Sequence, residues 1–252
     1  MSKAHATPKI GELVVVRHGE SGANADNAFA GWMNTPLSEK GIKEAKTVGK
    51  TLRSAGFKPE AVYSSPLERS VWTAIHMLTI MGMPGKMVTE SAALLDRHHG
   101  AFTGVNRDEA AATLGMTADE LHHCSYHTPP PPMDASHPYH PDNLSKCMKV
   151  IGLPANGTGT ETLKDVVERV QPFFQHEILP RMQRGEKVLI VTHGSTMRAL
   201  AICIEEITPE AANAAKISNA APIKYAITSE QGARDWTFEK SFITDQSLLL
   251  GV

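Results

Sequence analysis

Two His-Gly pairs follow short apolar runs near opposite ends of the chain. Leu13–Val16 leads into Arg17-His18-Gly19-Glu20, and Val188–Val191 leads through Thr192 into His193-Gly194-Ser195. An imidazole can act as a nucleophile once one ring nitrogen is fixed as the N–H, and a guanidinium holds an anion through a fork of donors. Glycine lets the backbone approach a bound group closely. If both runs are central strands of one parallel sheet, the two histidines converge at its carboxyl end, where α/β proteins bind ligands.

An arginine and an aspartate between these pairs would complete a site for phosphoryl transfer. Arg69 is predicted in the first turn of a helix, because it follows a strand that ends in Ser64-Ser65-Pro66. It lies either on a solvated helix face or, with Arg17 and the histidines, in a cationic ring suited to phosphoryl oxygens. A neutral imidazole can attack phosphorus to form a phosphohistidine, and the leaving alkoxide then needs a proton. Asp96 would supply that proton, unless it is a surface aspartate paired with Arg97.

Strand-like and helix-like segments alternate along the chain, which favours an α/β sheet. The predicted strands are Leu13–Val16, Ala61–Tyr63, Lys86–Thr89, Val188–Val191 and a last hairpin of Lys224–Thr228 with Trp236–Phe238. The predicted helices run from a cap at Ser38 to Gly56, follow Pro66 with a face from Leu67 to Leu78, extend from a cap at Thr160 to Ile178, and span Ser195–Ile204. The functional residues therefore follow strands.

The stretch 100–159 differs in composition from the rest of the chain. It contains Pro129–Pro132, a run rich in histidine and proline, and Asn156-Gly157-Thr158-Gly159. An insertion of this length within a compact domain is usually functional or disordered, and a proline run is extended and stiff. We therefore expect residues 1–252 to form one domain, in which 100–159 partly covers the carboxyl end of the sheet. Residues 240–252 are expected to form a mobile tail.

The composition argues against several functional classes. With 252 residues, 41% of them hydrophobic and 21% charged, the chain is typical of a soluble globular protein. A net charge of −2 argues against a surface that coats nucleic acid or membranes, and no segment reaches the roughly 20 apolar residues of a spanning helix. Met1–Lys9 lacks the apolar core of a secretion signal, and Cys124, Cys147 and Cys203 show no disulfide or metal spacing. We expect a cytoplasmic protein with reduced thiols.

The histidine pairs offer a competing interpretation as a zinc site. His98-His99 and His122-His123 occur in the same region as His137 and His140. A zinc site would usually add acidic or cysteine ligands in a tighter pattern. We therefore expect no metal.

Over nearly its whole length the chain resembles the 2,3-bisphosphoglycerate-dependent phosphoglycerate mutases of the histidine phosphatase superfamily. The residues that carry the resemblance are Arg17-His18-Gly19-Glu20-Ser21, Asn24, Asn27, Phe29, Gly31-Trp32, Leu37-Ser38, Ser65, Arg69, Arg97-His98, Gly100, Thr103-Gly104, Asn106, Ser125-Tyr126, Pro129–Pro132 with Met133, Glu161, Leu163-Lys164-Asp165, Val188–Ile190, His193-Gly194 and Arg198. The proline run at its expected place in the insertion favours the mutases over the general phosphatases.

The resemblance implies a three-layer α/β fold with a largely parallel sheet, and a role for each matched residue. His18 would be the phosphorylated nucleophile, and Arg17, Arg69 and His193 would hold the phosphoryl group. Asp96 falls where the family has its general acid. Further phosphate or substrate contacts are implied for Asn24, Ala30, Gly31, Arg97, His99, Arg107, His123, Cys124, Gly194 and Ser195. A 2,3-bisphosphoglycerate primer, a small phosphorylated substrate and a homodimer are also implied.

The chain departs from the family pattern within the pocket. Asp96 replaces a glutamate, and His123-Cys124 align with two arginines that hold the far anionic end of the substrate. The remaining departures are Ala30 for a serine, His99 for a tyrosine, Arg107 for a lysine and Ser195 for an asparagine. Each lost charge-assisted bond is worth about 1.5–3 kcal/mol, although Arg97, Arg107 and a partly protonated His123 offer compensation.

Three functions are therefore compared. The leading expectation is a mutase that interconverts 2- and 3-phosphoglycerate in glycolysis and gluconeogenesis. The departures motivate a second, a histidine phosphatase that hydrolyses another small phosphomonoester. The third is a non-catalytic relative that only binds phosphorylated ligands, against which the intact set of Arg17, His18, Arg69 and His193 argues.

Overall fold

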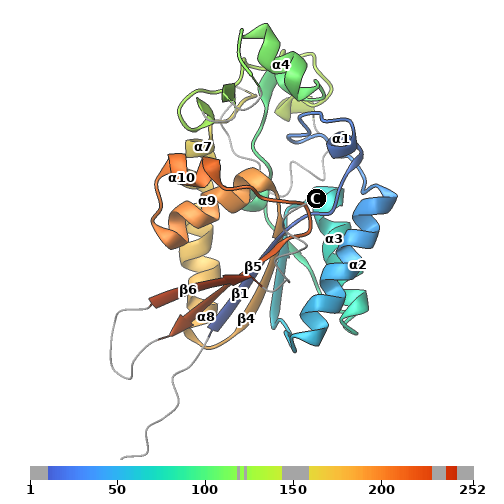
Figure 1. The fold of residues 1–252 in the computed structure, drawn as a ribbon, viewed down its shortest axis with the longest axis vertical. Helices are drawn as coiled ribbons and strands as arrows, with labels where there is room; N and C mark the ends of the chain where they lie inside the picture. The colour runs from blue at the N-terminus through green and yellow to red at the C-terminus, as the bar shows by residue number, and fades with distance from the viewer. Residues whose placement is uncertain (1–10, 118–119, 122–123, 144–158, 229–236, 243–252) are drawn as a thin grey trace, which may run out of the picture.

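A six-stranded sheet forms the centre of the computed structural model, which describes residues 11–117, 120–121, 124–143, 159–228 and 237–242 (Figure 1). The strands, in the spatial order β3-β2-β4-β1-β5-β6, are β1 (Gly11–Arg17), β2 (Ala61–Ser64), β3 (Thr89–Glu90), β4 (Lys187–Thr192), β5 (Pro222–Thr228) and β6 (Thr237–Phe242). The first four are parallel to one another, whereas β5 runs antiparallel to β1 and β6 antiparallel to β5. This confirms the predicted α/β fold with a largely parallel sheet.

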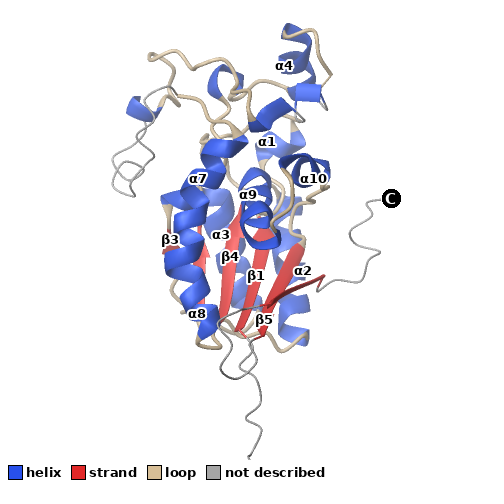
Figure 2. Cartoon of the chain, turned by 90° about the vertical axis from the view of Figure 1, so that its left-hand side faces the viewer, coloured by secondary structure: helices blue, strands red, loops and turns tan. Residues whose placement is uncertain are grey.

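Helices cover both faces of the sheet. They are α1 (Gly22–Ala25), α2 (Glu39–Ser54), α3 (Glu68–Ile80), α4 (Arg107–Thr113), α7 (Leu163–Phe173), a π-helical turn (Phe174–Ile178), α8 (Leu179–Gln183), α9 (Gly194–Glu205) and α10 (Pro209–Ala214). Short 3-10 helices lie at Ala92–Leu94, Gly100–Phe102, Cys124–Tyr126 and Pro141–Asn143. Figure 2 shows α7, α8 and α9 in front of the sheet, with α2 and α3 behind it.

The apolar run of β1 is continuous because both of its faces are buried. Leu13 and Val15 pack in the core beneath α7 and α9, whereas Val14 and Val16 pack in the core beneath α2 and α3. Parallel strands that are covered on both sides are expected to lack the polar alternation of a half-exposed strand. The resulting three layers fix the central strands and hence the residues at their carboxyl ends.

Two predicted boundaries are wrong and have local explanations. The helix that was expected to begin at Thr160 begins at Leu163, because Thr162 and Asp165 form a reciprocal capping box, whereas Thr160 donates to the carbonyl of Pro130. The strand expected at Lys86–Thr89 is reduced to Thr89–Glu90, which pairs with only two residues of β2. By contrast, Ser38 caps α2 as predicted.

The last hairpin exists, but the tail does not begin at residue 240. Lys240–Phe242 belongs to β6, which pairs with β5, and residues 243–252 lie outside the described part of the chain. Trp236, the predicted first residue of the second strand, also lies outside it.

The described part of 100–159 lies beyond the carboxyl ends of the central strands, with α4 at the far end of the molecule from α8 (Figure 1). It is joined to the segment after β1 by bridges from Ala28 to Asn106 and from Phe29 to Thr103. Within this stretch, the proline run contacts the 3-10 helix Gly100–Phe102, since the amide of Ala101 donates to the carbonyl of Pro131. Residues 144–158 of this stretch lie outside the description, as does Met1–Lys9. Within the described residues, no helix is both long and apolar enough to cross a membrane.

Candidate active site

The two histidines converge because β1 and β4 are adjacent parallel strands. Arg17 pairs with Thr192 at the ends of these strands, so the next residues, His18 and His193, are neighbours. The amide of His18 donates to the carbonyl of Thr192 at 2.9 Å, and the two imidazole centroids lie 5.1 Å apart. The predicted convergence is confirmed.

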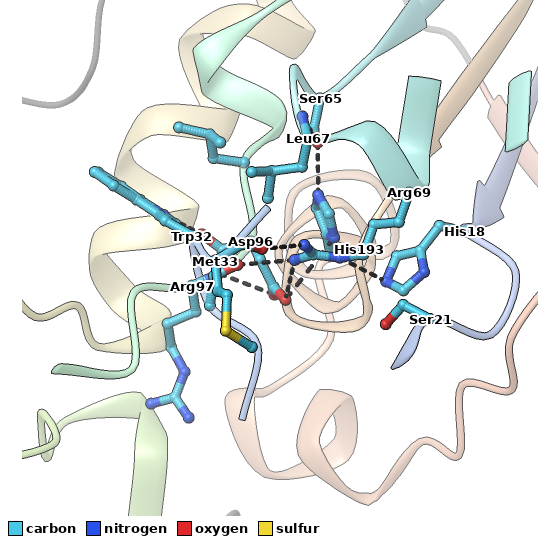
Figure 3. A network of polar contacts seen from close by, with 12 residues as sticks. His18, Ser21, Trp32, Met33, Ser65, Leu67, Arg69, Asp96, Arg97 and His193 are labelled. Atoms are coloured by element: carbon cyan, nitrogen blue, oxygen red, sulfur yellow. Dashed lines mark hydrogen bonds and ion pairs between the residues drawn. The ribbon is translucent and has the colours of Figure 1, made fainter. Parts of the chain in front are cut away.

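The His18 imidazole is held in the form that a nucleophile requires. Its Nδ1 lies 2.7 Å from the carbonyl oxygen of Gly19, which only accepts, so Nδ1 carries the proton. Arg69 Nε donates to Nε2 at 3.3 Å, which leaves the Nε2 lone pair facing a cation (Figure 3). Burial lowers the pKa of His18 well below its usual value, and the charges of Arg69 and Arg17 lower it further. The ring is therefore neutral, with Nε2 as its basic atom.

Glycine is needed at position 19 for a different reason from the one expected. A Cβ at Gly19 would overlap the backbone carbonyl of Gly41 in the first turn of α2, and a Cβ at Gly41 would overlap the carbonyl of Glu20. The close approach that glycine permits here is between the His18 loop and a helix, not between the loop and a ligand. The amide of Gly19 also donates to Thr73 Oγ1 at 3.0 Å.

Arg69 is fully buried, so the solvated-face alternative is wrong. Its Nη1 and Nη2 donate to the carbonyls of Met33 and Gly31, each at 2.8 Å. Nη2 also lies 3.4 Å from Asp96 Oδ2. Asp96, with a side chain only 14% exposed, thus pairs with Arg69, while the Arg97 side chain points away from this network (Figure 3).

His193 is held by two serines. Its Nε2 lies 2.6 Å from Ser65 Oγ and 3.3 Å from Ser70 Oγ. The amide of Leu67 already donates to Ser65 Oγ, so the hydroxyl proton is available to Nε2, which favours the tautomer protonated on Nδ1. Nδ1 is buried, has no hydrogen-bond partner among the described residues, and lies 3.8 Å from Asp96 Oδ2.

Most of the predicted site residues surround one cavity of about 100 Å³. Its lining consists of Arg17, His18, Asn24, Phe29, Ala30, Asp96, Arg97, His99, Arg107, Gly194, Ser195 and Arg198. The cavity thus gathers residues from the end of β1, from α1 and the loop after it, from the loop after β3, and from the starts of α4 and α9. Arg69 and His193 lie behind this lining, in contact with His18 and Asp96.

The predictions missed Arg198 and Phe29 as lining residues, and Ser65 as the partner of His193. Arg198 lies one helical turn after Gly194 at the start of α9, a spacing that was visible in the sequence. Phe29 lies beneath Arg107, whose guanidinium carbon is 5.2 Å from the ring centroid. The contacts of Ser65 had no sequence signal, because its partner is 128 residues away.

Three other predicted site residues are not among the described residues that line the cavity. Gly31, with φ of +48°, gives its carbonyl oxygen to Arg69 and does not line the cavity. Cys124 begins a 3-10 helix, and nothing is described of its side chain. His123 lies outside the described residues. No group of three potential metal ligands occurs among the residues that the structure describes.

The cavity is strongly cationic. Arg17, Arg97, Arg107 and Arg198 line it, against one carboxylate, Asp96. Burial and neighbouring arginines lower the pKa of both Arg17 and Arg198 to about 10, so both stay charged at neutral pH. The Nε atoms of three of these arginines (all but Arg97) are buried without a hydrogen-bond partner in the described structure. Such unsatisfied donors around a cavity are suited to a ligand with more than one negative charge.

The buried histidines predict a loss of stability in mild acid. Burial and nearby arginines lower the pKa of His18, His99 and His193 well below the usual 6.5. Below that value the unfolded chain binds protons that the folded chain does not, so the free energy of unfolding falls as pH falls. The slope is about 1.4 kcal/mol per pH unit for each histidine. Urea denaturation between about pH 7.5 and 5.5 should show this decline, and His193→Asn should reduce its slope by up to about 1.4 kcal/mol per pH unit. An unfolding free energy independent of pH in this window would contradict the prediction.

The chain matches known proteins in fold and in sequence pattern. The chain resembles a mycobacterial glucosyl-3-phosphoglycerate phosphatase in complex with VO3, at 19% identity and a TM-score of 0.68, over 92% of this chain and 98% of that one. It resembles a phosphoglycerate mutase from Bacillus anthracis at 20% identity and a TM-score of 0.67, over 93% of each chain. These likenesses show the fold. The sequence pattern of the histidine phosphatase superfamily (branch 1) matches residues 13–151 and 133–238. With this match across most of its length, the chain belongs to the histidine phosphatase superfamily.

Proposed function

We propose that the protein transfers phosphoryl groups through a phosphohistidine at His18, and that its substrate is a small phosphomonoester with a second anionic group. The observation that carries this proposal is the cavity of about 100 Å³ with four arginines and one carboxylate in its lining. A single phosphoryl group beside Arg17 and Arg69 would leave the buried Nε donors of Arg107 and Arg198 unsatisfied among the described residues.

The reaction begins with the neutral His18 imidazole. The Arg69 Nε–H that donates to Nε2 turns to a phosphoryl oxygen, which frees the Nε2 lone pair to attack phosphorus. The N–P bond forms, and the bond from phosphorus to the ester oxygen breaks. Arg69 and Arg17 stabilise the phosphoryl oxygens by fixed charge, together with the Nδ1–H of His193. Asp96 supplies the carboxyl group in the cavity lining, and in its protonated form it would donate to the departing alkoxide. In the return step, Asp96 accepts a proton from the hydroxyl that attacks phospho-His18.

The specific reaction that we propose is the interconversion of 2- and 3-phosphoglycerate. The unsatisfied arginine donors in the cavity fit a 2,3-bisphosphoglycerate primer, which supplies the phosphoryl group that first loads His18. Arg97, Arg107 and Arg198 would hold the carboxylate and second phosphate, a task for which the family uses arginines at the positions of His123 and Cys124. Each such charge-assisted bond contributes about 1.5–3 kcal/mol, so these three arginines would keep much of the affinity for the second anion, although the family has cations at the same three positions as well.

A phosphatase is the second candidate, and the position of Asp96 favours it. The side chain of Asp96 is one methylene shorter than the family's glutamate and is 14% exposed. The space of the missing methylene would be available to a water that attacks phospho-His18. Hydrolysis then replaces transfer back to a sugar acid. A glucosyl-3-phosphoglycerate phosphatase is among the structures with this fold, and its named substrate also contains a phosphorylated glycerate.

One assay run in two ways separates these candidates. Turnover of 3-phosphoglycerate is measured by coupling to enolase, with and without 2,3-bisphosphoglycerate, and phosphate release is measured in parallel. A mutase should show primer-stimulated turnover much faster than phosphate release. Phosphate release as the faster reaction would establish the phosphatase, and absence of both reactions would exclude phosphoglycerate as the substrate.

A further inference from the structure

The loop that carries Asp96 is held by side chains from four separate elements. The carbonyls of four consecutive residues, Ala93–Asp96, all accept hydrogen bonds from side chains. Thr192 and Thr196 bind two of them, each at 2.7 Å, and Trp32 Nε1 binds the carbonyl of Asp96 at 2.8 Å. The remaining donor is Arg169 on α7, the residue that contacts the most carbonyls of this loop.

Arg169 uses its whole guanidinium for this purpose. Nη1 donates to the carbonyl of Ala93 at 2.8 Å, and Nη2 donates to those of Leu95 and Asp96, each at 2.9 Å. Nε and Nη2 also bind the two carboxylate oxygens of Glu161, at 3.0 and 3.2 Å. A planar fork with five N–H donors can serve this many acceptors at once, whereas an ammonium group cannot.

Glu161 extends the same network past Asp96. Its side chain is 1% exposed, and Oε2 accepts the amide of His98 at 2.8 Å. Arg169 therefore fixes the backbone before and at Asp96, and Glu161 fixes it two residues later. Neither side chain lines the cavity, so the proposed reaction gives them no direct role.

We propose that Arg169 is a positioning residue that holds the Asp96 carboxyl group at the distance needed for proton transfer, an inference that rests on the proposed phosphoryl transfer. Aspartate has one methylene fewer than glutamate, so its reach is set more directly by the backbone. A shift of the loop by about 1 Å moves the carboxyl group by a similar distance, and misplacement on that scale costs about 10²-fold in rate.

Leaving-group chemistry distinguishes positioning from simple stabilisation. An alkoxide such as that of 3-phosphoglycerate needs the proton of Asp96, whereas p-nitrophenolate departs readily without one. A positioning role therefore predicts a loss confined to the alkyl ester. A merely structural role predicts similar losses for both esters, because folding affects every substrate equally.

The test compares Arg169→Lys with the wild type, with 3-phosphoglycerate and p-nitrophenyl phosphate as substrates. The measured quantity is the loss of the phosphoryl group from each substrate, whether water or a sugar acid receives that group. We expect kcat/KM to fall by about 10²-fold for the alkyl ester and by less than about threefold for the aryl ester. Asp96→Asn should show the same split, at least as large. Arg181→Lys is the matched control, since Arg181 pairs with Glu186 and Tyr63 outside the cavity lining and should leave both rates unchanged.

Hydrogen exchange provides a readout that does not depend on activity. In Arg169→Lys, and in the charge-neutral Arg169→Gln/Glu161→Gln double variant, amide exchange should accelerate over residues 93–99 and remain unchanged in β1 and β4. Equal losses on both esters, or unchanged exchange over 93–99, would overturn the positioning role. If the wild-type protein forms no phosphohistidine and cleaves neither ester, the proposed function is refuted instead. The hydrogen-exchange result would then still decide whether Arg169 fixes this loop.

Discussion

Replacing His18 with asparagine should lower phosphoryl transfer by at least about 10⁴-fold, because the variant loses the nucleophile on which both half-reactions depend. The asparagine amide can still donate to the carbonyl of Gly19, as Nδ1 does at 2.7 Å in the wild type, so the loop keeps this bond. It offers no nitrogen lone pair in place of Nε2. The measurement is kcat/KM, together with detection of an acid-labile phosphohistidine by intact mass.

Exposed His176 provides the control for the same chemical change. His176→Asn should retain wild-type rates and the phosphorylated intermediate. The nucleophile assignment would be wrong if His18→Asn kept rates within about tenfold of the wild type, or if the variant still became phosphorylated at a histidine.

Replacing Arg69 with lysine should lower the rate by about 10²- to 10³-fold, the usual cost of removing one donor from a site of developing negative charge. Arg69 contacts His18, two backbone carbonyls and Asp96 at once, and an ammonium group cannot match that geometry. Because lysine keeps the positive charge, the fall in rate reports the loss of the guanidinium's geometry more than a loss of charge. Steady-state rates should be compared at equal folded concentration, which circular dichroism reports.

Arg53→Lys is the matched control, because Arg53 is exposed on α2 and donates to the carbonyl of Ile80 at the end of α3. It should have no effect on the rate. An Arg69→Lys rate within about threefold of the wild type would show that this guanidinium does not contact the transferring group.

The sequence alone predicted the central strands and the residues that follow them. The runs at Leu13–Val16 and Val188–Val191 are apolar without alternation because both faces of the sheet are covered, and such runs are visible without a structure. The convergence of His18 and His193 followed from one further assumption, that their strands lie centrally in the same parallel sheet. The structure confirms it through the pairing of Arg17 with Thr192.

The sequence could not identify contacts that depend on the approach of distant elements. Arg169 binds carbonyls more than 70 residues away, and Ser65 binds His193 from 128 residues away. Neither leaves a periodic or spacing signal, because side-chain hydrogen bonds to backbone carbonyls require no particular residue at the acceptor position. The same limit applies to Gly19, for which the sequence suggests close approach to a ligand, whereas its close neighbour in the structure is Gly41.

The sequence by itself determined the fold class, the likeness to the histidine phosphatase superfamily, and the positions of Arg17, His18 and His193 at the ends of two central strands, since local hydrophobic pattern and motif suffice for these. Only the tertiary structure decided what faces them. Arg198 joins Arg97 and Arg107 in the lining of one cavity, and Arg69 turns inward to Asp96. Those positions depend on how α9, α4 and the loop after β3 pack over the sheet, and packing between segments far apart in sequence is a property of the whole folded chain.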